Sequence, residues 1–136
     1  MVQILQNSFL QKNTKHQLDK ISRILSKILP IYWAFLTYML LKPGVENLEY
    51  PFMFNGVDKI LHLCIFALLG CLFMATFPKI RFHWFIPIMF GYGLLTEILQ
   101  DQMGLGRSFE VLDLVADTIG VTIGYFLFKR LMKINF

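Results

Sequence analysis

Residues 109–128 read FEVLDLVADTIGVTIGYFLF, an apolar run that carries three carboxylates, Glu110, Asp113 and Asp117. In a helix, the spacing i, i+3 and i+7 places all three on one face. A membrane span that began only after Asp117 would keep 11 residues, or about 17 Å of helix. The hydrocarbon core of a bilayer is about 30 Å thick. If this run crosses a membrane, Asp113 and Asp117 must therefore lie at membrane depth.

The composition of the chain is that of a membrane protein. Of its 136 residues, 56% are hydrophobic, 16% are charged and 14 are Phe. An average soluble domain is about 45–50% apolar and about 25% charged. A soluble chain of this length could not bury so much apolar surface. These proportions exclude an ordinary soluble domain.

Four apolar segments have the length of a transmembrane helix, and they are residues 24–41, 60–77, 82–100 and 109–128. Each has about 18–20 residues, which is the number needed to cross the hydrocarbon core. The connections between them are short and contain Pro and Gly. The sequence therefore predicts an all-α fold, an integral membrane four-helix bundle over residues 24–128.

Two basic segments flank the predicted bundle. Residues 1–23 form a leader with scattered apolar residues, which we expect to lie on the membrane surface as an interfacial helix or to be partly disordered. Residues 129–136 form a short basic tail. The expected division of the chain is thus a leader, one membrane domain and a tail.

The distribution of charge predicts the orientation of the bundle. Ten of the 13 basic residues lie on the side of the two termini, namely Lys12, Lys15, Lys20, Arg23, Lys27, Lys79, Arg81, Lys129, Arg130 and Lys133. The positive-inside rule makes this side cytoplasmic. The other side receives eight of the nine acids, all except Asp19. We therefore predict that both termini are cytoplasmic, and we expect no nucleic-acid partner.

In this topology, polar residues from three spans meet at the outer end of the bundle. They are Asp58, Lys59 and His62 at the start of the second span, Glu97 and Gln100 at the end of the third, Arg107 in the loop, and Asp113 and Asp117 in the fourth. A charged residue at membrane depth costs about 2.5–3.5 kcal/mol on insertion scales unless it is paired or hydrated. Such residues usually face the interior of the bundle and serve a function.

Each of these residues also has a purely structural interpretation. Asp58 could cap its helix and orient His62, which lies four residues later. Lys59 could extend its ammonium group to the outer interface. Gln100 could link two helices rather than contact a ligand. We expect the remaining acids of this end, Asp101 and Glu110, to be solvated charges at the rim.

The alternatives for Arg107 and the acids of the fourth span stay open as well. Arg107 could be the counter-ion of the acids, or it could bind an anionic substrate group. Asp113 and Asp117 could form a buried pairing network with nearby basic groups. Gly120 and Gly124 form a GxxxG pattern, which is typical of close helix packing in membranes.

The order of the polar residues resembles the VanZ-like family. The pattern is DKxxH at 58–62, ExxQ at 97–100, Arg107, DxxxD at 113–117 and then Gly120, and it covers about residues 55–125. The family takes its name from a protein associated with resistance to the glycopeptide teicoplanin. The resemblance implies that the polar cluster is a functional site, although it names no reaction. We accordingly expect a multi-pass protein of the bacterial cytoplasmic membrane.

Our main functional hypothesis is a site that binds or modifies an anionic envelope lipid or a lipid-linked cell-wall intermediate. The candidate catalytic residues are His62, Glu97 and Asp113, as general acid or base. The candidate substrate-binding residues are Asp58, Lys59, Gln100, Arg107 and Asp117. A phosphate headgroup would contact the basic members of this set.

Three other functions were weighed against lipid binding. The chain could be a small non-catalytic subunit or assembly partner of a larger envelope complex. Proton movement along Glu97, Asp113 and Asp117 is disfavoured, because the inner half of the bundle is apolar. A metal site built from Asp58, His62, Glu97 and Asp113 is conceivable, but no spacing here is diagnostic of one. The sequence therefore predicts neither a metal nor a cofactor.

Overall fold

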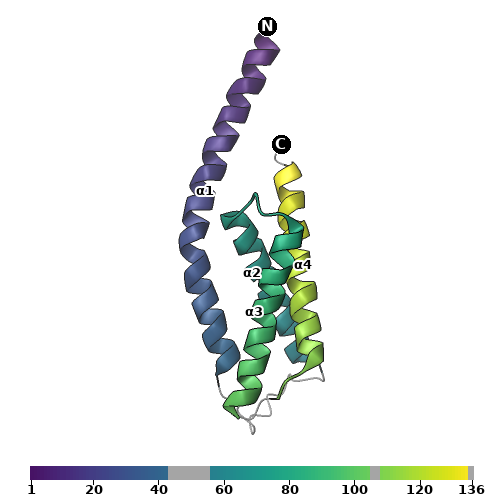
Figure 1. The fold of residues 1–136 in the computed structure, drawn as a ribbon. Coiled ribbons are helices and arrows are strands. Elements are labelled where there is room, and N and C mark those ends of the chain that lie inside the picture. Colours follow the sequence, from purple (N-terminus) through teal and green to yellow (C-terminus); the bar gives the residue numbers. More distant parts are fainter. Residues whose placement is uncertain (43–55, 105–107, 135–136) are drawn as a thin grey trace.

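A computed structural model of the chain describes residues 1–42, 56–104 and 108–134, and these form four helices and no strand (Figure 1). The helices are α1 (Val2–Leu41), α2 (Val57–Thr76), α3 (Phe82–Met103) and α4 (Val111–Ile134). Each contains a stretch that is long and apolar enough to cross a membrane. The predicted all-α bundle of four spans is confirmed.

The bounds of α1 differ most from the predicted segment. The span was expected over residues 24–41, but α1 has 40 residues and runs without a break from the leader into the span. At 1.5 Å per residue this is about 60 Å, twice the thickness of the hydrocarbon core. In Figure 1 the first half of α1 continues well past the other three helices. The location of the leader at the membrane surface stays a prediction.

Glycines bring α2 and α4 into backbone contact. A Cβ atom added at Gly120 would lie 2.5 Å from the Leu63 carbonyl oxygen, and one at Gly124 would overlap the carbonyl oxygen of Ala67. On the opposite side of the interface, a Cβ atom at Gly70 would lie 2.7 Å from the Val121 carbonyl oxygen. The GxxxG pattern of α4 thus serves helix packing, as expected. Among the described helices, α2 and α4 form the most extensive contact.

Aromatic side chains fill the centre of the bundle. Phe66 and Phe85 are fully buried. Trp33 of α1 contacts Phe73 edge-on at 5.9 Å and Tyr92 at 5.2 Å between ring centroids. These contacts join three helices around one apolar core.

Polar contacts at different depths hold α1 against the bundle, and they include a 2.9 Å hydrogen bond between the Thr37 and Tyr92 hydroxyl groups. Near one end the Ser22 hydroxyl donates to the Ala75 carbonyl oxygen at 3.0 Å. In the middle the Tyr32 hydroxyl donates to the carbonyl oxygen of Ile65 at 2.8 Å. At the other end Gln100 of α3 donates through Nε2 to the carbonyl oxygen of Leu40 at 2.6 Å.

Both ends of the described chain lie at one end of the bundle (Figure 1). The polar residues lie near the starts of α2 and α4 and near the end of α3, which is the opposite end of the bundle. α2 and α4 begin at this polar end, whereas α1 and α3 finish there. This arrangement is the one that the even number of spans requires. The side of the membrane on which each end lies stays a prediction.

Candidate functional site

The site is built from side chains at similar depths on three helices. His62 follows the first residue of α2 by five positions, and Asp117 follows the first residue of α4 by six. Glu97 precedes the last residue of α3 by six. These offsets correspond to about 8–9 Å along each helix axis. The fold therefore brings residues of α2, α3 and α4 to a similar depth, as the sequence predicted.

His62 is held by Asp117 of the neighbouring helix. Its Nδ1 lies 2.9 Å from Asp117 Oδ1, and the two residues are 7% and 2% exposed. An ionised carboxylate can only accept a hydrogen bond, so Nδ1 carries the hydrogen. In the neutral imidazole this leaves a lone pair on Nε2. Asp117 thus orients the ring so that its second nitrogen is available for chemistry.

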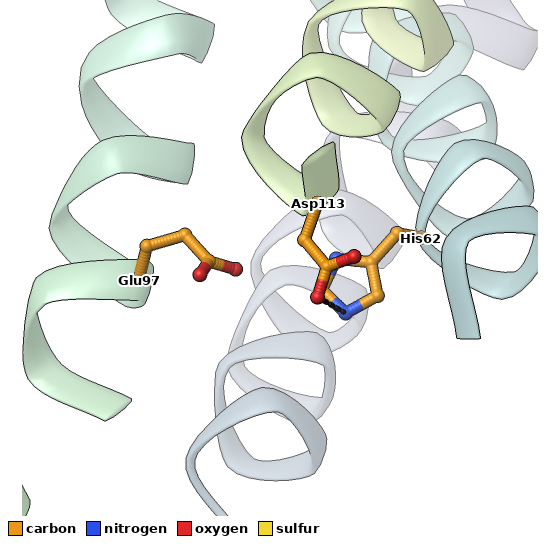
Figure 2. Close-up of side chains that lie close together, drawn as sticks. All are labelled: His62, Glu97 and Asp113. Carbon is orange, nitrogen blue, oxygen red and sulfur yellow. Dashed lines mark ion pairs between the residues drawn. The ribbon is translucent and has the colours of Figure 1, made fainter. Parts of the chain in front are cut away.

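His62 lies close to two further carboxylates, those of Asp113 and Glu97. Asp113 Oδ2 lies 4.0 Å from Nε2. One ligand atom each of His62, Glu97 and Asp113 can be chosen so that all three lie within 4.8 Å of one another. Figure 2 shows these side chains pointing toward one another from α2, α3 and α4. We call these three residues the inner trio.

Glu97 also holds the start of α4. Its Oε2 accepts a hydrogen bond from the backbone N–H of Glu110 at 3.2 Å, although Glu97 belongs to α3 and is only 1% exposed. The first N–H groups of a helix have no partner within the helix, and negative charge is favoured at that end. A carboxylate from another helix therefore performs the capping function for α4.

Lys59 occupies a second group of carboxylates, the outer trio of Asp58, Glu110 and Asp113. Its Nζ lies 2.8 Å from Asp58 Oδ2, 2.8 Å from Glu110 Oε2 and 3.3 Å from Asp113 Oδ1. An ammonium group has three N–H donors, and two of them are used in the hydrogen bonds to Asp58 and Glu110. Asp113 belongs to both trios and connects them.

Two buried oxygens of the site, Asp113 Oδ1 and Asp117 Oδ2, accept no hydrogen bond from any described residue. Asp113 Oδ1 has only the 3.3 Å ionic contact with Lys59, whose geometry is not that of a hydrogen bond. Asp117 Oδ2 would lie 3.4 Å from a Cβ atom at Gly93, so glycine leaves room for this carboxylate against α3. Buried polar atoms are normally satisfied, and these two mark a place where a polar ligand would be stabilised.

The described part of the site is strongly acidic. It contains five carboxylates, Asp58, Glu97, Glu110, Asp113 and Asp117, against one lysine and one histidine. Lys59 offsets only one of the three negative charges of the outer trio. Charge in a buried site is costly unless it is compensated. An anionic group would therefore be stabilised here only together with a cation or a proton.

An apolar cavity of about 320 Å³ lies between α1 and α2 and reaches the site. Its α1 wall is lined by Tyr32, Phe35, Leu36, Met39 and Leu40, and its α2 wall by Val57, Asp58, Leu61, His62 and Ile65. The hydrogen bond from Tyr32 to Ile65 joins the two walls at their deeper end. The polar members of the lining, Asp58 and His62, lie nearer the start of α2. A long apolar group in this cavity could thus place its polar end at His62.

The structural interpretation fails for Asp58 and agrees with the contacts of Gln100. Asp58 does not cap α2, because Gly56 holds that position without a side-chain hydrogen bond. The partner that orients His62 is Asp117 rather than Asp58. Gln100 is 5% exposed and links α3 to Leu40, which is the interhelical role.

The remaining predictions have mixed outcomes. Asp101 and Glu110 are exposed, as expected of rim residues. Lys59 donates hydrogen bonds to Asp58 and Glu110, and its predicted substrate-binding role stays a prediction. Arg107 lies outside the described residues, so its two interpretations stay open.

Sequence reasoning missed the contributions of Glu110 and Gly93. Glu110 was assigned to the rim, yet its backbone N–H binds Glu97 and its side chain binds Lys59. Its position directly before the first residue of α4 was an available signal, because helix-capping positions make such contacts. Gly93 lies one turn before Glu97 on α3, on the face that meets Asp117, and this spacing could also have indicated its role.

Comparison with known proteins agrees with this geometry. A family model described as VanZ/LLP1 matches residues 2–133. The match includes the N-terminal leader, which the motif resemblance over residues 55–125 did not cover. No curated protein and no solved structure matches the chain. A match over nearly the whole length shows that this four-span membrane protein belongs to the VanZ/LLP1 family.

Proposed function

We propose that the site binds an anionic envelope lipid, with the lipid chain in the cavity between α1 and α2 and the headgroup at His62. The observation that carries this proposal is the apolar cavity of about 320 Å³ whose lining includes His62 and Asp58. Its volume is near the lower end for small-molecule sites. The rest of a long chain would lie in the surrounding bilayer. A lipid-linked cell-wall intermediate has the same two parts.

The affinity of such a site comes mainly from the headgroup. A lipid chain gains little by moving from the bilayer into an apolar groove, because both surroundings are apolar. The groove instead selects the shape and fixes the position of the chain. Polar contacts near His62 then determine which headgroup is bound.

We further propose that His62 transfers a proton to or from the bound headgroup. The orientation by Asp117 supports this role, because it leaves the lone pair of Nε2 on the side of Asp113, whose Oδ2 lies 4.0 Å away. A positioned acid or base contributes about 10²–10⁴-fold to a reaction rate. A link to glycopeptide susceptibility, suggested by the family name, would follow if the lipid is a cell-wall intermediate.

The proposed location is the bacterial cytoplasmic membrane, with both termini in the cytoplasm and the site in the outer half of the bilayer. The charge asymmetry supports it, since ten of the 13 basic residues flank the end of the bundle that carries the termini. The headgroup would then be one exposed on the outer leaflet.

We expect Met39→Trp to weaken lipid binding at least about 10-fold. Met39 lines the cavity from α1 and is 45% exposed, so an indole ring there would occupy the space of a lipid chain. The matched control is Ile31→Trp, on the same helix, at a position that is 71% exposed and does not line the cavity. Native mass spectrometry in detergent, with polyprenyl phosphate and glycerophospholipid titrations, measures the affinity.

Saturable binding by the wild-type protein and by Ile31→Trp, together with weak binding by Met39→Trp, is the expected pattern. Binding that does not saturate, or equal losses in the two tryptophan variants, would contradict the proposed lipid site.

A second function, assembly with other envelope proteins, is favoured by the extension of α1. The N-terminal part of α1 continues past the bundle (Figure 1). The exposed apolar residues in the first half of this helix include Val2, Phe9 and Ile21. We expect removal of residues 2–18 to abolish co-purification of a partner protein while the bundle stays folded. Mild-detergent purification after cross-linking measures this. Recovery of the full-length protein only as a free monomer would count against assembly.

A further inference from the structure

We propose that the inner trio of His62, Glu97 and Asp113 binds a divalent transition-metal ion. The three residues supply one imidazole nitrogen and two carboxylate oxygens from three helices, and ligand atoms from each lie within 4.8 Å of one another. A single ion with bonds of about 2.1 Å holds its ligands about 3–3.5 Å apart. The three side chains would need to draw together by about 1 Å.

The supporting contacts around the trio are those of a metal site. Ligating histidines almost always donate their other ring N–H to a carboxylate or a similar acceptor, and ligating carboxylates are themselves hydrogen-bonded. Here Asp117 accepts from His62 Nδ1 at 2.9 Å, and the N–H of Glu110 binds Glu97 Oε2 at 3.2 Å. The ligand atoms are thus oriented before any ion arrives.

Comparison of the two trios provides an independent argument for a cation. The outer trio surrounds the Lys59 ammonium group at 2.8–3.3 Å. The inner trio is more buried, with Glu97 1% and His62 7% exposed, and its one ionic contact with a described lysine or arginine is that of Asp113 with Lys59. This single ammonium group also contacts Asp58 and Glu110, so the fixed positive charge among the described residues does not balance the carboxylates of the two trios.

The contact between His62 and Asp113 also points to a bound ion. With the hydrogen on Nδ1, both Nε2 and Asp113 Oδ2 are acceptors, and they face each other at 4.0 Å (Figure 2). Two acceptors stabilise each other only through a proton or a cation between them. Asp113 is 9% exposed, and its other oxygen accepts no hydrogen bond from a described residue. A metal ion would satisfy both side chains.

The ligand types select the metal. One imidazole with two carboxylates suits zinc, manganese or ferrous iron, whereas magnesium and calcium prefer oxygen ligands alone. Three protein ligands leave at least one position open, as in catalytic zinc sites. A phosphate oxygen in that position would bind the ion directly. This last step rests on the proposed lipid-binding function, whereas the metal site itself does not.

The test is metal binding by the full-length protein in detergent. After treatment with a chelator, we expect equilibrium dialysis with Zn²⁺ or Mn²⁺ to give about one ion per chain. Glu97→Gln and Asp113→Asn should each lower the affinity at least about 10-fold, and Asp117→Asn about 10–100-fold through His62. Asp101→Asn and His83→Asn are matched controls at exposed positions outside the trio, and their affinity should change less than about twofold.

Two results of the dialysis experiment would overturn the metal site. One is a wild-type protein that binds neither ion saturably, as expected if a protonated His62 or the Arg107 side chain is the cation. The other is equal affinity in Glu97→Gln and Asp101→Asn. Electron paramagnetic resonance of the Mn²⁺-loaded wild-type protein gives a readout that does not depend on the folding of variants. Absence of coupling to a histidine nitrogen would likewise exclude the site.

The result of the metal-binding test can be distinguished from the result of the lipid-binding test. Metal binding that persists in Met39→Trp, with lipid binding lost, supports both proposals. Metal binding by a protein that binds no lipid contradicts the proposed function alone. Lipid binding that is unchanged after the chelator, in a protein that binds no metal, overturns the metal site alone.

Discussion

Gly124→Ala is expected to destabilise the bundle by about 3 kcal/mol or more. A Cβ atom at this position would overlap the Ala67 carbonyl oxygen and lie 2.8 Å from the Cys71 nitrogen. Both atoms belong to the backbone of α2, which cannot rotate away as a side chain could. Overpacking usually costs about 1–3 kcal/mol, and a clash between two helix backbones belongs at the upper end.

The matched control is Gly91→Ala. Gly91 lies within α3, and a Cβ atom there would meet nothing within 4 Å. Alanine in a helix is favoured over glycine by about 0.5–1 kcal/mol, so this variant should be as stable as the wild type or slightly more stable. Thermal unfolding in detergent, followed by helical circular dichroism, measures both changes. Equal stability of the two variants would contradict the close α2–α4 contact.

His62→Leu is expected to have the largest effect within the polar site. It leaves Asp117, which is 2% exposed, without its hydrogen-bond donor. Leaving a buried acceptor without its donor typically costs about 1–3 kcal/mol, and more when the acceptor is charged, because its desolvation is uncompensated. The same change removes the proposed proton-transfer group, so modification of a lipid should fall by at least about 10²-fold.

A double variant separates these two effects. In His62→Leu/Asp117→Asn the buried charge is also removed, so at least half of the lost stability should return. Activity should not return, because the imidazole is still absent. Denaturation in detergent and an assay of lipid conversion measure the two quantities. His83→Leu, at an exposed position at the opposite end of the bundle, should change neither, and unchanged stability in His62→Leu would show that the pair with Asp117 is unimportant.

The helices of this protein were predictable because the signals that define them are local. A run of apolar residues long enough to cross a bilayer can be read directly along the chain, and 82–100 and 109–128 correspond closely to α3 and α4. The start of α1 was not predictable in this way. Polar residues of the leader give no apolar signal, yet α1 begins at Val2.

The membership of the site was also largely predictable. Carboxylates and a histidine in apolar spans are costly at membrane depth, so their presence alone indicated a cluster. The sequence even placed Asp113, Asp117, Gly120 and Gly124 on one face of a helix. Helical periodicity predicts which residues lie on the same face of a helix. It does not predict which residue of a neighbouring helix each of them contacts.

The pairing within the site was decided by tertiary structure. Asp58 and His62 are four residues apart and were the natural local pair, but His62 bonds to Asp117, 55 residues away. The reason is that Gly120 and Gly124 let α4 approach the backbone of α2, which brings Asp117 within 2.9 Å of the imidazole. Only the packed helices determine this distance.

The division between sequence and tertiary structure has a simple physical origin. Hydrophobic length and charge asymmetry act residue by residue, so the sequence by itself determined a four-span membrane protein with a polar cluster at one end. Hydrogen bonds and ion pairs form only when the side chains of different helices are positioned to within a few tenths of an ångström. The roles of Asp117 as the partner of His62, of Glu97 as the cap of α4 and of Lys59 as the cation of the outer trio therefore emerged only from the packed bundle.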